Sequence, residues 1–393
     1  MRYLILILGP LLFGGCATTG LVLNDKADTL EKPTNEIAEQ QLLDVWIETF
    51  DPGELPKDDD LAQGLSMEIR EAEARYIPMQ LGSTMERSGH WGSVRMVPQP
   101  GEGGEVLVSG RIIASDGGML QLQISARDAT GREWFNRSYG LSVDTDTSDS
   151  QVVRIELFQG LYNIIANELA RYRDGLNSDD VTRIRRVAEI RFAKDLAPDA
   201  FARYLKTDGG EYDIVGLPSV DDPMYRRIQA IRERDFMLID TLNGHFDNFV
   251  LEMQEPYDEW RSARTEELEA LRAIEREALQ RKVLGIAAIA GAIALGASSN
   301  SDVRAQTGTL RDVMVLGGIY AMKTGFDKEG ETAIHQAAIE ELDASFSAEA
   351  EPLVVEIDGE VHELTGSAET QYAQWRSLLR QIYASETGLI PAP

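Results

Sequence analysis

Apolar and polar side chains alternate strictly from residue 120 to residue 126. The stretch is MLQLQISA, in which Leu120, Leu122, Ile124 and Ala126 are separated by glutamine and serine. This period of two is that of a β-strand with one face on a hydrophobic core and the other in water. The pattern therefore predicts a sheet of which one face is covered.

Three more strand-like runs surround this one. They span 91–98, 105–115 and 132–143, and turn sequences separate them, namely GEGG at 101–104, DGG at 116–118 and DATG at 128–131. Short turns of this kind join neighbouring antiparallel strands. We therefore predict a meander of antiparallel hairpins.

An apolar run at 42–50 predicts a further strand, and residues 67–89 have the spacing of a helix that is interrupted near Pro78. A helix on a sheet of hairpins is an α+β layer. The predicted fold class is therefore α+β. It has an N-terminal helix on a mostly antiparallel sheet within residues 42–145, followed by a long mainly helical region with a short C-terminal β-hairpin.

Helical spacing dominates residues 150–282. Helices are predicted at 152–172, at 179–205 with a break at Pro198, and at 224–282, with a loop at 206–223. Pro256 is expected to kink or end the last of these helices, because proline has no backbone N–H. Beyond Pro256 a narrow apolar stripe suits either a partner helix or an ordinary solvated helix.

Two apolar segments follow, VLGIAAIAGAIALGAS at 283–298 and VMVLGGIYAMKTGF at 313–326. Fifteen helical residues reach about 22 Å, short of the roughly 30 Å hydrocarbon core of a bilayer, and small residues let two helices approach closely. We expect a Gly/Ala-rich helical hairpin over 283–326, with membrane insertion as the alternative. The residues assigned to its packing or oligomer interface are Gly285, Ala288, Ala292, Gly296, Gly317 and Gly318.

The C-terminal segment, 327–393, is expected to form a helix, a hairpin and a second helix. The helices are predicted at 331–347 and 368–384. Between them the strands PLVVEI and EVHELT are joined by Asp358-Gly359, a dipeptide typical of two-residue hairpin turns.

The N-terminus combines basic Arg2, an apolar run at 4–13, and two glycines before Cys16, the only cysteine. This order resembles the bacterial lipoprotein signal, with Phe13 in place of the usual leucine; the alternative is an ordinary secretory signal with an accidental cysteine. The resemblance implies a signal peptide at 1–15 and a lipid on Cys16. Because Ala17 follows, it also implies the outer membrane, with the body in the periplasm. The polar residues 16–41 are expected to form a flexible tether.

Charge excludes one class of partner. The formal net charge is -28, whereas nucleic-acid binding needs clustered lysine and arginine. We therefore expect no nucleic-acid partner. With a single cysteine, no disulfide can form within the chain, and the fold must depend on packing.

No pattern in the sequence indicates a catalytic or metal site. The four histidines, His90, His245, His335 and His362, are isolated from one another, and the glycine pairs lack the lysine and serine of a phosphate loop. There is no GxSxG motif, and the five tryptophans suit core positions. We expect no enzyme activity, no metal, and no cofactor apart from the covalent lipid on Cys16.

The run VSGRIIASDGGMLQLQISARDATGREWFNRSYG is similar to the later strands of the N-terminal domain of TolB, which several envelope accessory lipoproteins share. The resemblance covers residues 42–143 and rests on the strand pattern and the phrase DATGREWF. Relatives of that domain include the curli secretion lipoprotein, activators of penicillin-binding proteins and auxiliary lipoproteins of transport systems. The resemblance implies a protein that binds or assembles and supplies no catalytic residues.

These observations favour a lipid-anchored adaptor or assembly component of a periplasmic or outer-membrane machine. Its expected partners are the membrane, through the lipid, and envelope proteins, with a homo-oligomer as an open possibility. The alternative function is an oligomeric export channel that uses segments 283–326. A cell-wall enzyme or its activator is a third hypothesis.

Overall fold

The computed structural model describes residues 22–23, 29–56, 65, 67–142, 158–295, 353–357 and 360–387, with only the backbone of the long helix beyond Arg261. Its elements are, in chain order, β1 (Val22–Leu23), η1 (Glu39–Gln41), β2 (Val45–Glu48), α2 (Met67–Ser88), β3 (Val94–Val97), β4 (Val106–Ser115), β5 (Met119–Asp128), β6 (Glu133–Ser142), α3 (Gln159–Asp174), α4 (Ser178–Leu196), α5 (Pro198–Phe201), η2 (Ala202–Tyr204), β7 (Leu205–Asp208), β8 (Glu211–Ile214), α6 (Pro223–Leu295), β9 (Leu353–Ile357), β10 (Glu360–Leu364) and α9 (Ala368–Thr387).

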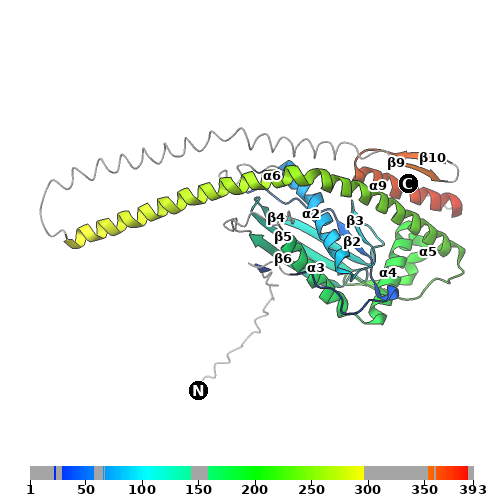
Figure 1. The fold of residues 1–393 in the computed structure, drawn as a ribbon. Helices are drawn as coiled ribbons and strands as arrows, with labels where there is room; N and C mark the ends of the chain where they lie inside the picture. Colours follow the sequence, from blue (N-terminus) through cyan, green and yellow to red (C-terminus); the bar gives the residue numbers. More distant parts are fainter. Residues whose placement is uncertain are drawn as a thin grey trace, which may run out of the picture.

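Six strands form one mixed sheet in the order β1-β6-β5-β4-β2-β3 (Figure 1). The pairs β4–β5 and β5–β6 are antiparallel, as predicted. Strand β2 lies between β3 and β4 and is parallel to both, and β1 is parallel to β6. The fold is therefore α+β, but the predicted arrangement is wrong in two respects. The first described helix, α2, follows strands, and the sheet is not a meander of hairpins.

The order of the elements explains the parallel pairing. Parallel neighbours need a long crossover connection, and α2 supplies it between β2 and β3. The segment GEGG at 101–104 is therefore not a hairpin turn. It belongs to the connection from β3 to β4, which lie on opposite sides of β2, and it crosses β2 at Trp46. A Cβ atom on Gly104 would lie 2.8 Å from Cγ of Trp46, and one on Gly103 would lie 3.0 Å from Phe192. The glycines are needed for this close approach.

Helices α2 and α3 cover one face of the sheet (Figure 1). The alternating residues Leu120, Leu122, Ile124 and Ala126 are fully buried there, which confirms the predicted core face. Helix α2 runs without a break through Pro78, so the predicted interruption is wrong. Since proline cannot donate to the carbonyl of Ala74 four residues earlier, that carbonyl accepts the backbone N–H of Phe50 at 2.9 Å instead.

A second core lies around Trp46, where α4, α6 and α9 pack together. The predicted break at Pro198 is confirmed, since α4 ends at Leu196 and α5 begins at Pro198. The predicted loop at 206–223 contains a hairpin, β7–β8, that the polar sequence did not indicate. Its turn is made by Gly209 and Gly210, both with positive φ.

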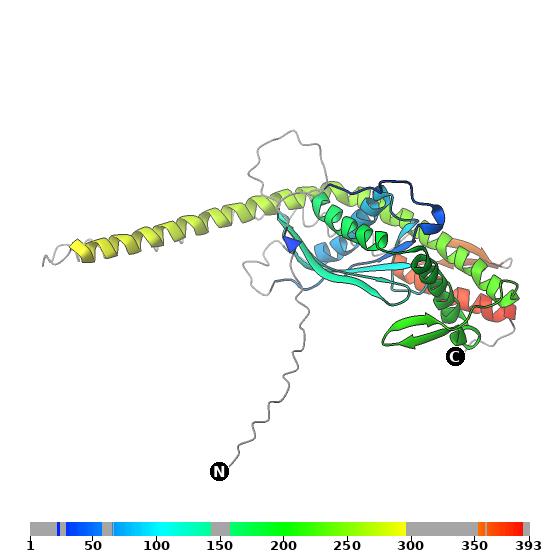
Figure 2. The same cartoon turned by 90° about the horizontal axis from the view of Figure 1, so that it is seen from below.

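Helix α6 is 73 residues long. It does not end at Pro256, and beyond the body it continues as a projecting arm, residues 262–295 (Figures 1 and 2). The predicted hairpin β9–β10 and the predicted helix after it, α9, are both present. No helix in the described part of the chain is both long enough and apolar enough to cross a membrane.

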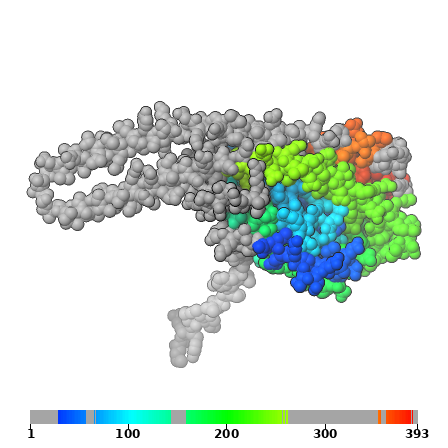
Figure 3. Space-filling view, in the orientation of Figure 1, coloured from blue at the N-terminus to red at the C-terminus, as the bar shows by residue number. Residues whose placement is uncertain are grey.

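Several predictions fall wholly or partly outside the described residues. They include the signal peptide at 1–15, the boundary at 145–150, the Gly/Ala-rich hairpin at 283–326 and the helix at 331–347. Residues 29–41 of the predicted tether are ordered, and their backbone accepts hydrogen bonds from α3 and α4. They lie on the surface of the body, in blue in Figure 3.

Candidate functional site

Helix α6 leaves the body at three buried side chains, Tyr257, Trp260 and Arg261, which we call the root. They are 1%, 1% and 3% exposed. The rings of Tyr257 and Trp260 stack 5.7 Å apart. The guanidinium of Arg261 lies 4.6 Å from the ring centroid of Phe158, which just precedes α3. Such cation–π contacts are strong when water is excluded, so the root fixes the helix to the body.

A buried carboxylate connects the root to the sheet. Glu73 of α2 is fully buried, and its Oε1 accepts hydrogen bonds from Ser115 Oγ at 2.5 Å and Tyr257 OH at 2.6 Å. Arg70 Nε lies 3.8 Å from Oε2 of Glu73, and Arg70 Nη2 donates to the carbonyl of Ser115 at 3.0 Å. We call these four residues the Glu73 cluster. It joins α2, β4 and α6 at one point.

Burial raises the pKa of Glu73 above its ordinary value, against the opposing charge of Arg70 and the two hydroxyl donors. Burial also raises the pKa of Tyr257, so the phenol keeps its proton and remains a donor. Glutamate, serine and tyrosine could serve acid–base chemistry elsewhere, but a substrate would have to reach them. Both Glu73 and Tyr257 lie inside the core, where the arrangement holds a helix in place.

A second buried carboxylate, Asp235, holds the first half of α6. Its Oδ1 accepts from Trp375 Nε1 at 3.0 Å and its Oδ2 accepts from Arg376 Nη1 at 3.1 Å, both on α9. Arg376 also pairs with Asp195 of α4, which in turn contacts Arg380 at 3.3 Å. We call this set the Asp235 clamp. It ties α4, α6 and α9 together.

Between the Asp235 clamp and the root, α6 covers the edge strand β3. The side-chain amide of Asn243 accepts from the backbone N–H of Met96 at 2.7 Å and donates to its carbonyl at 2.8 Å. One turn earlier, Asp240 pairs with Arg95 at 2.6 Å. An open edge is a template for unwanted strand pairing, and here the helix occupies it.

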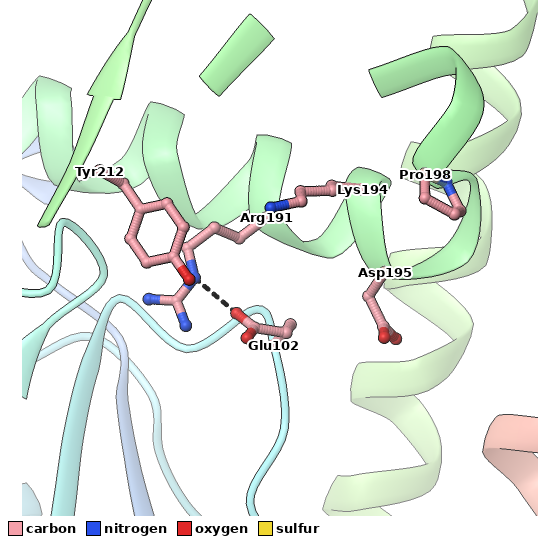
Figure 4. A pocket seen from close by; sticks show the side chains of 6 residues that line it. All are labelled: Glu102, Arg191, Lys194, Asp195, Pro198 and Tyr212. Atoms are coloured by element: carbon pink, nitrogen blue, oxygen red, sulfur yellow. Dashed lines mark ion pairs between the residues drawn. The ribbon is translucent and has the colours of Figure 1, made fainter. Parts of the chain in front are cut away.

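A hollow of about 290 Å³ lies where the GEGG crossing, the end of α4 and β8 meet (Figure 4). Most of its charged side chains have partners within the protein. Arg191 Nε is 2.5 Å from Glu102, and its guanidinium lies 4.5 Å from the ring centroid of Tyr212. Asp195 belongs to the Asp235 clamp. These contacts brace the surface around the hollow.

Among the described residues, no group of histidine, cysteine, aspartate and glutamate side chains has the composition and proximity to hold a metal ion. His90 is buried, with Nε2 at 3.7 Å from Asp174. Burial lowers the pKa of His90. His335 lies outside the described residues.

The phrase DATGREWF has a structural explanation. Asp128 is fully buried, and its Oδ2 accepts from Trp134 Nε1 at 3.0 Å and from Arg132 Nε at 3.1 Å. Its Oδ1 accepts from the backbone N–H of Thr130 at 2.9 Å. The aspartate thus builds the β5–β6 turn and positions Trp134 against Trp91, at 6.2 Å between centroids.

The predicted site residues lie mostly outside the described part of the chain. These are Cys16, Gly296, Gly317 and Gly318. The other three, Gly285, Ala288 and Ala292, lie near the end of the arm, where the backbone is helical. The structure therefore leaves the predicted hairpin contact between 283–298 and 313–326 as a prediction.

The sequence analysis missed Glu73, Asp235 and Asn243. Each was part of a helix rich in charged or polar residues, where a solvated position is the usual expectation. One indication was available. Asp235 stands between Ile231 and Leu238 on an apolar stripe, so it falls on the buried side of α6.

No protein-family model, curated protein or solved structure matches the chain. The resemblance of residues 42–143 to the N-terminal domain of TolB therefore stays a prediction, as do the lipid anchor and the outer-membrane location.

Proposed function

We propose that this protein is a non-enzymatic, lipid-anchored envelope protein, attached through Cys16 to the outer membrane and facing the periplasm. Its globular body holds the arm of α6 and presents it to a partner protein in a periplasmic or outer-membrane machine. The observation that carries this proposal is the way in which α6 is held. The Asp235 clamp, Asn243 and the root fix its first half before it projects.

The arm is long enough to act as a spacer. It extends from residue 262 to residue 295, and at 1.5 Å per residue this is about 50 Å. In proteins most of the stability of a helix comes from packing against other elements, not from intrinsic propensity. Burial of the root gives the arm a fixed start, which an adaptor needs in order to place a partner at a set distance.

Site-specific photocrosslinking tests the adaptor function. A photoreactive amino acid at Ala270 or Ala278, in the arm, should crosslink to one envelope protein in intact cells. The matched control is Leu251, which is 70% exposed on the packed half of the same helix, and should not give that product. Crosslinks from Leu251 alone, or none from the arm, would contradict the proposal.

The proposed lipid on Cys16 is tested by a separate experiment. Palmitate labelling of the chain should be lost in Cys16→Ala. Labelling that persists in this variant would remove the lipid from the proposal and leave the arm's role unaffected.

A further inference from the structure

The N-terminal segment 29–42 is held on the surface of the body, and we call it the strap. At its start the side-chain amide of Asn167 in α3 donates to the carbonyl of Thr29 at 2.9 Å and accepts from the backbone N–H of Glu31 at 2.8 Å. Asn167 is 2% exposed. A buried amide that satisfies both groups of the passing backbone gives that backbone a defined position.

Arginines hold the rest of the strap. Arg173 donates to the carbonyl of Gln41 at 2.9 Å, and Arg185 donates to the carbonyls of Gln40 at 3.0 Å, Glu39 at 3.3 Å and Leu42. Guanidinium groups offer several donors in a fixed geometry. The side chains of Arg173 and Arg185 can therefore restrain the backbone of residues 39–42. Residues 29–41 of the expected tether are therefore part of the body.

Upstream of the strap, β1 adds to the edge of the sheet. Val22 and Leu23 pair with Tyr139 and Gly140 of β6. In both views of the ribbon, β1 lies at the end of the body from which the arm projects (Figures 1 and 2). The chain thus approaches the body at this end.

The chain available between Cys16 and the body is short. Val22 follows Cys16 by six residues and Thr29 follows it by thirteen. A fully extended chain spans at most about 3.5 Å per residue, so these stretches reach about 20 Å and about 45 Å. Resting on the lipid anchor proposed above, we infer that the surface around the C-terminal end of β6 faces the membrane at close range, with a phospholipid headgroup layer as its partner.

The whole chain carries a net charge of -28, and repulsion from anionic headgroups acts over about 10 Å at physiological salt. The lipid on Cys16, and not the charge of the body, must therefore hold this surface near the membrane.

Fluorescence quenching tests the inference. Once lipid occupies Cys16, an introduced cysteine is the only free thiol, so Ser142→Cys and Ser219→Cys each accept one dye. Ser142 is the exposed last residue of β6. Ser219 is also exposed and lies four residues before α6, which begins at the end of the body opposite to the arm (Figure 1).

The lipidated full-length protein is bound to vesicles of phosphatidylethanolamine and phosphatidylglycerol that carry a quencher on some headgroups. We expect quenching at position 142 to exceed that at position 219 several-fold. A Gly-Ser insertion of twelve residues after Gly20 should remove most of the difference, because it lengthens only the connection. Equal quenching at both positions in the unmodified chain would overturn the inference. Failure of the protein to float with the vesicles would instead overturn the lipid anchor, and this inference with it.

Discussion

Two buried carboxylates hold α6, and they do so by different chemistry. Asp235, in the first half of the helix, makes direct contacts with a guanidinium and an indole N–H at 3.1 and 3.0 Å. Glu73, at the exit of the helix, accepts from two hydroxyl groups, and its nearest guanidinium nitrogen is 3.8 Å away. The first is a charge pair, and the second is mainly a set of neutral donors around an acid.

This difference determines how each of the two carboxylates responds to the loss of a partner or to a change of pH. Removal of one partner from a buried charge pair leaves a desolvated charge behind, which is costly. An acid surrounded by hydroxyl groups can instead take up a proton and become neutral. Burial raises the pKa of both carboxylates, but Asp235 has a guanidinium within hydrogen-bond distance. We therefore expect the Asp235 clamp to supply more stability and the Glu73 cluster to be the more sensitive to pH.

The largest effect should follow from Asp235→Ala. Loss of one partner of a buried pair costs roughly 3–5 kcal/mol, and we expect the low end of that range because Arg376 keeps Asp195. Urea unfolding of the body measures it. The control is Asp195→Ala, which removes a more exposed carboxylate from the same guanidinium and should cost about 1 kcal/mol or less. Equal losses in the two variants would show that burial of Asp235 is unimportant.

A smaller loss is expected from Asn243→Ala, which tests the contact of α6 with β3 between the Asp235 clamp and the root. It leaves the N–H and the carbonyl of Met96 without their partner, at a cost of about 1–3 kcal/mol. Asn248→Ala is the matched control, since Asn248 is exposed on the same helix. If both variants unfold at the same urea concentration, the edge of β3 does not depend on α6.

Most of the elements could be predicted from periodicity, apart from β1 and the hairpin β7–β8, but their partners could not. Alternation at Leu120–Ala126 and helical spacing in α9 depend on neighbours in sequence, and both are confirmed. The position of β2 depends on a crossover through α2, and no local pattern in VWIE records that. Continuity through Pro78 likewise depends on Phe50, a residue far away in the chain.

The candidate site was harder to predict, because its polar residues are buried by distant elements. Glu73 meets Tyr257 across 184 positions of sequence, and Asp235 meets Arg376 across 141. The strap was missed for the same reason, since Arg173 and Arg185 lie more than a hundred residues beyond it. A polar residue in a helix is usually solvated, and only tertiary contacts identify the exceptions.

Tyr257→Phe separates the neutral donor from the rest of the Glu73 cluster. Loss of the phenol leaves Ser115 as the remaining hydroxyl donor to Glu73, and we expect about 1–2 kcal/mol of lost stability. The control is Tyr225→Phe, because Tyr225 on the same helix donates to the half-buried Glu189 at 2.9 Å. Urea unfolding should show a smaller loss for the control, since water can replace that bond. A larger loss in the control would contradict the importance of the root.

The smallest expected change, taken per pH unit, is a pH dependence to which Glu73 contributes. Because burial raises its pKa in the folded chain, the folded state holds this proton to a higher pH than the unfolded state, where release occurs near 4.5. As pH rises above that value, the stability contributed by Glu73 should fall until the folded-state pKa has been passed, by at most about 1.4 kcal/mol per pH unit for one proton.

Measurement of unfolding free energy against pH for the natural chain and for Glu73→Gln isolates this term. The unfolding free energy of the natural chain minus that of Glu73→Gln should decrease as the pH rises from 4.5 to the folded-state pKa of Glu73. Glu71→Gln, which changes an exposed residue of the same helix, should follow the natural chain. A difference that grows with pH would mean that Glu73 is ionised in the folded protein, and that both anchors of α6 are charge pairs.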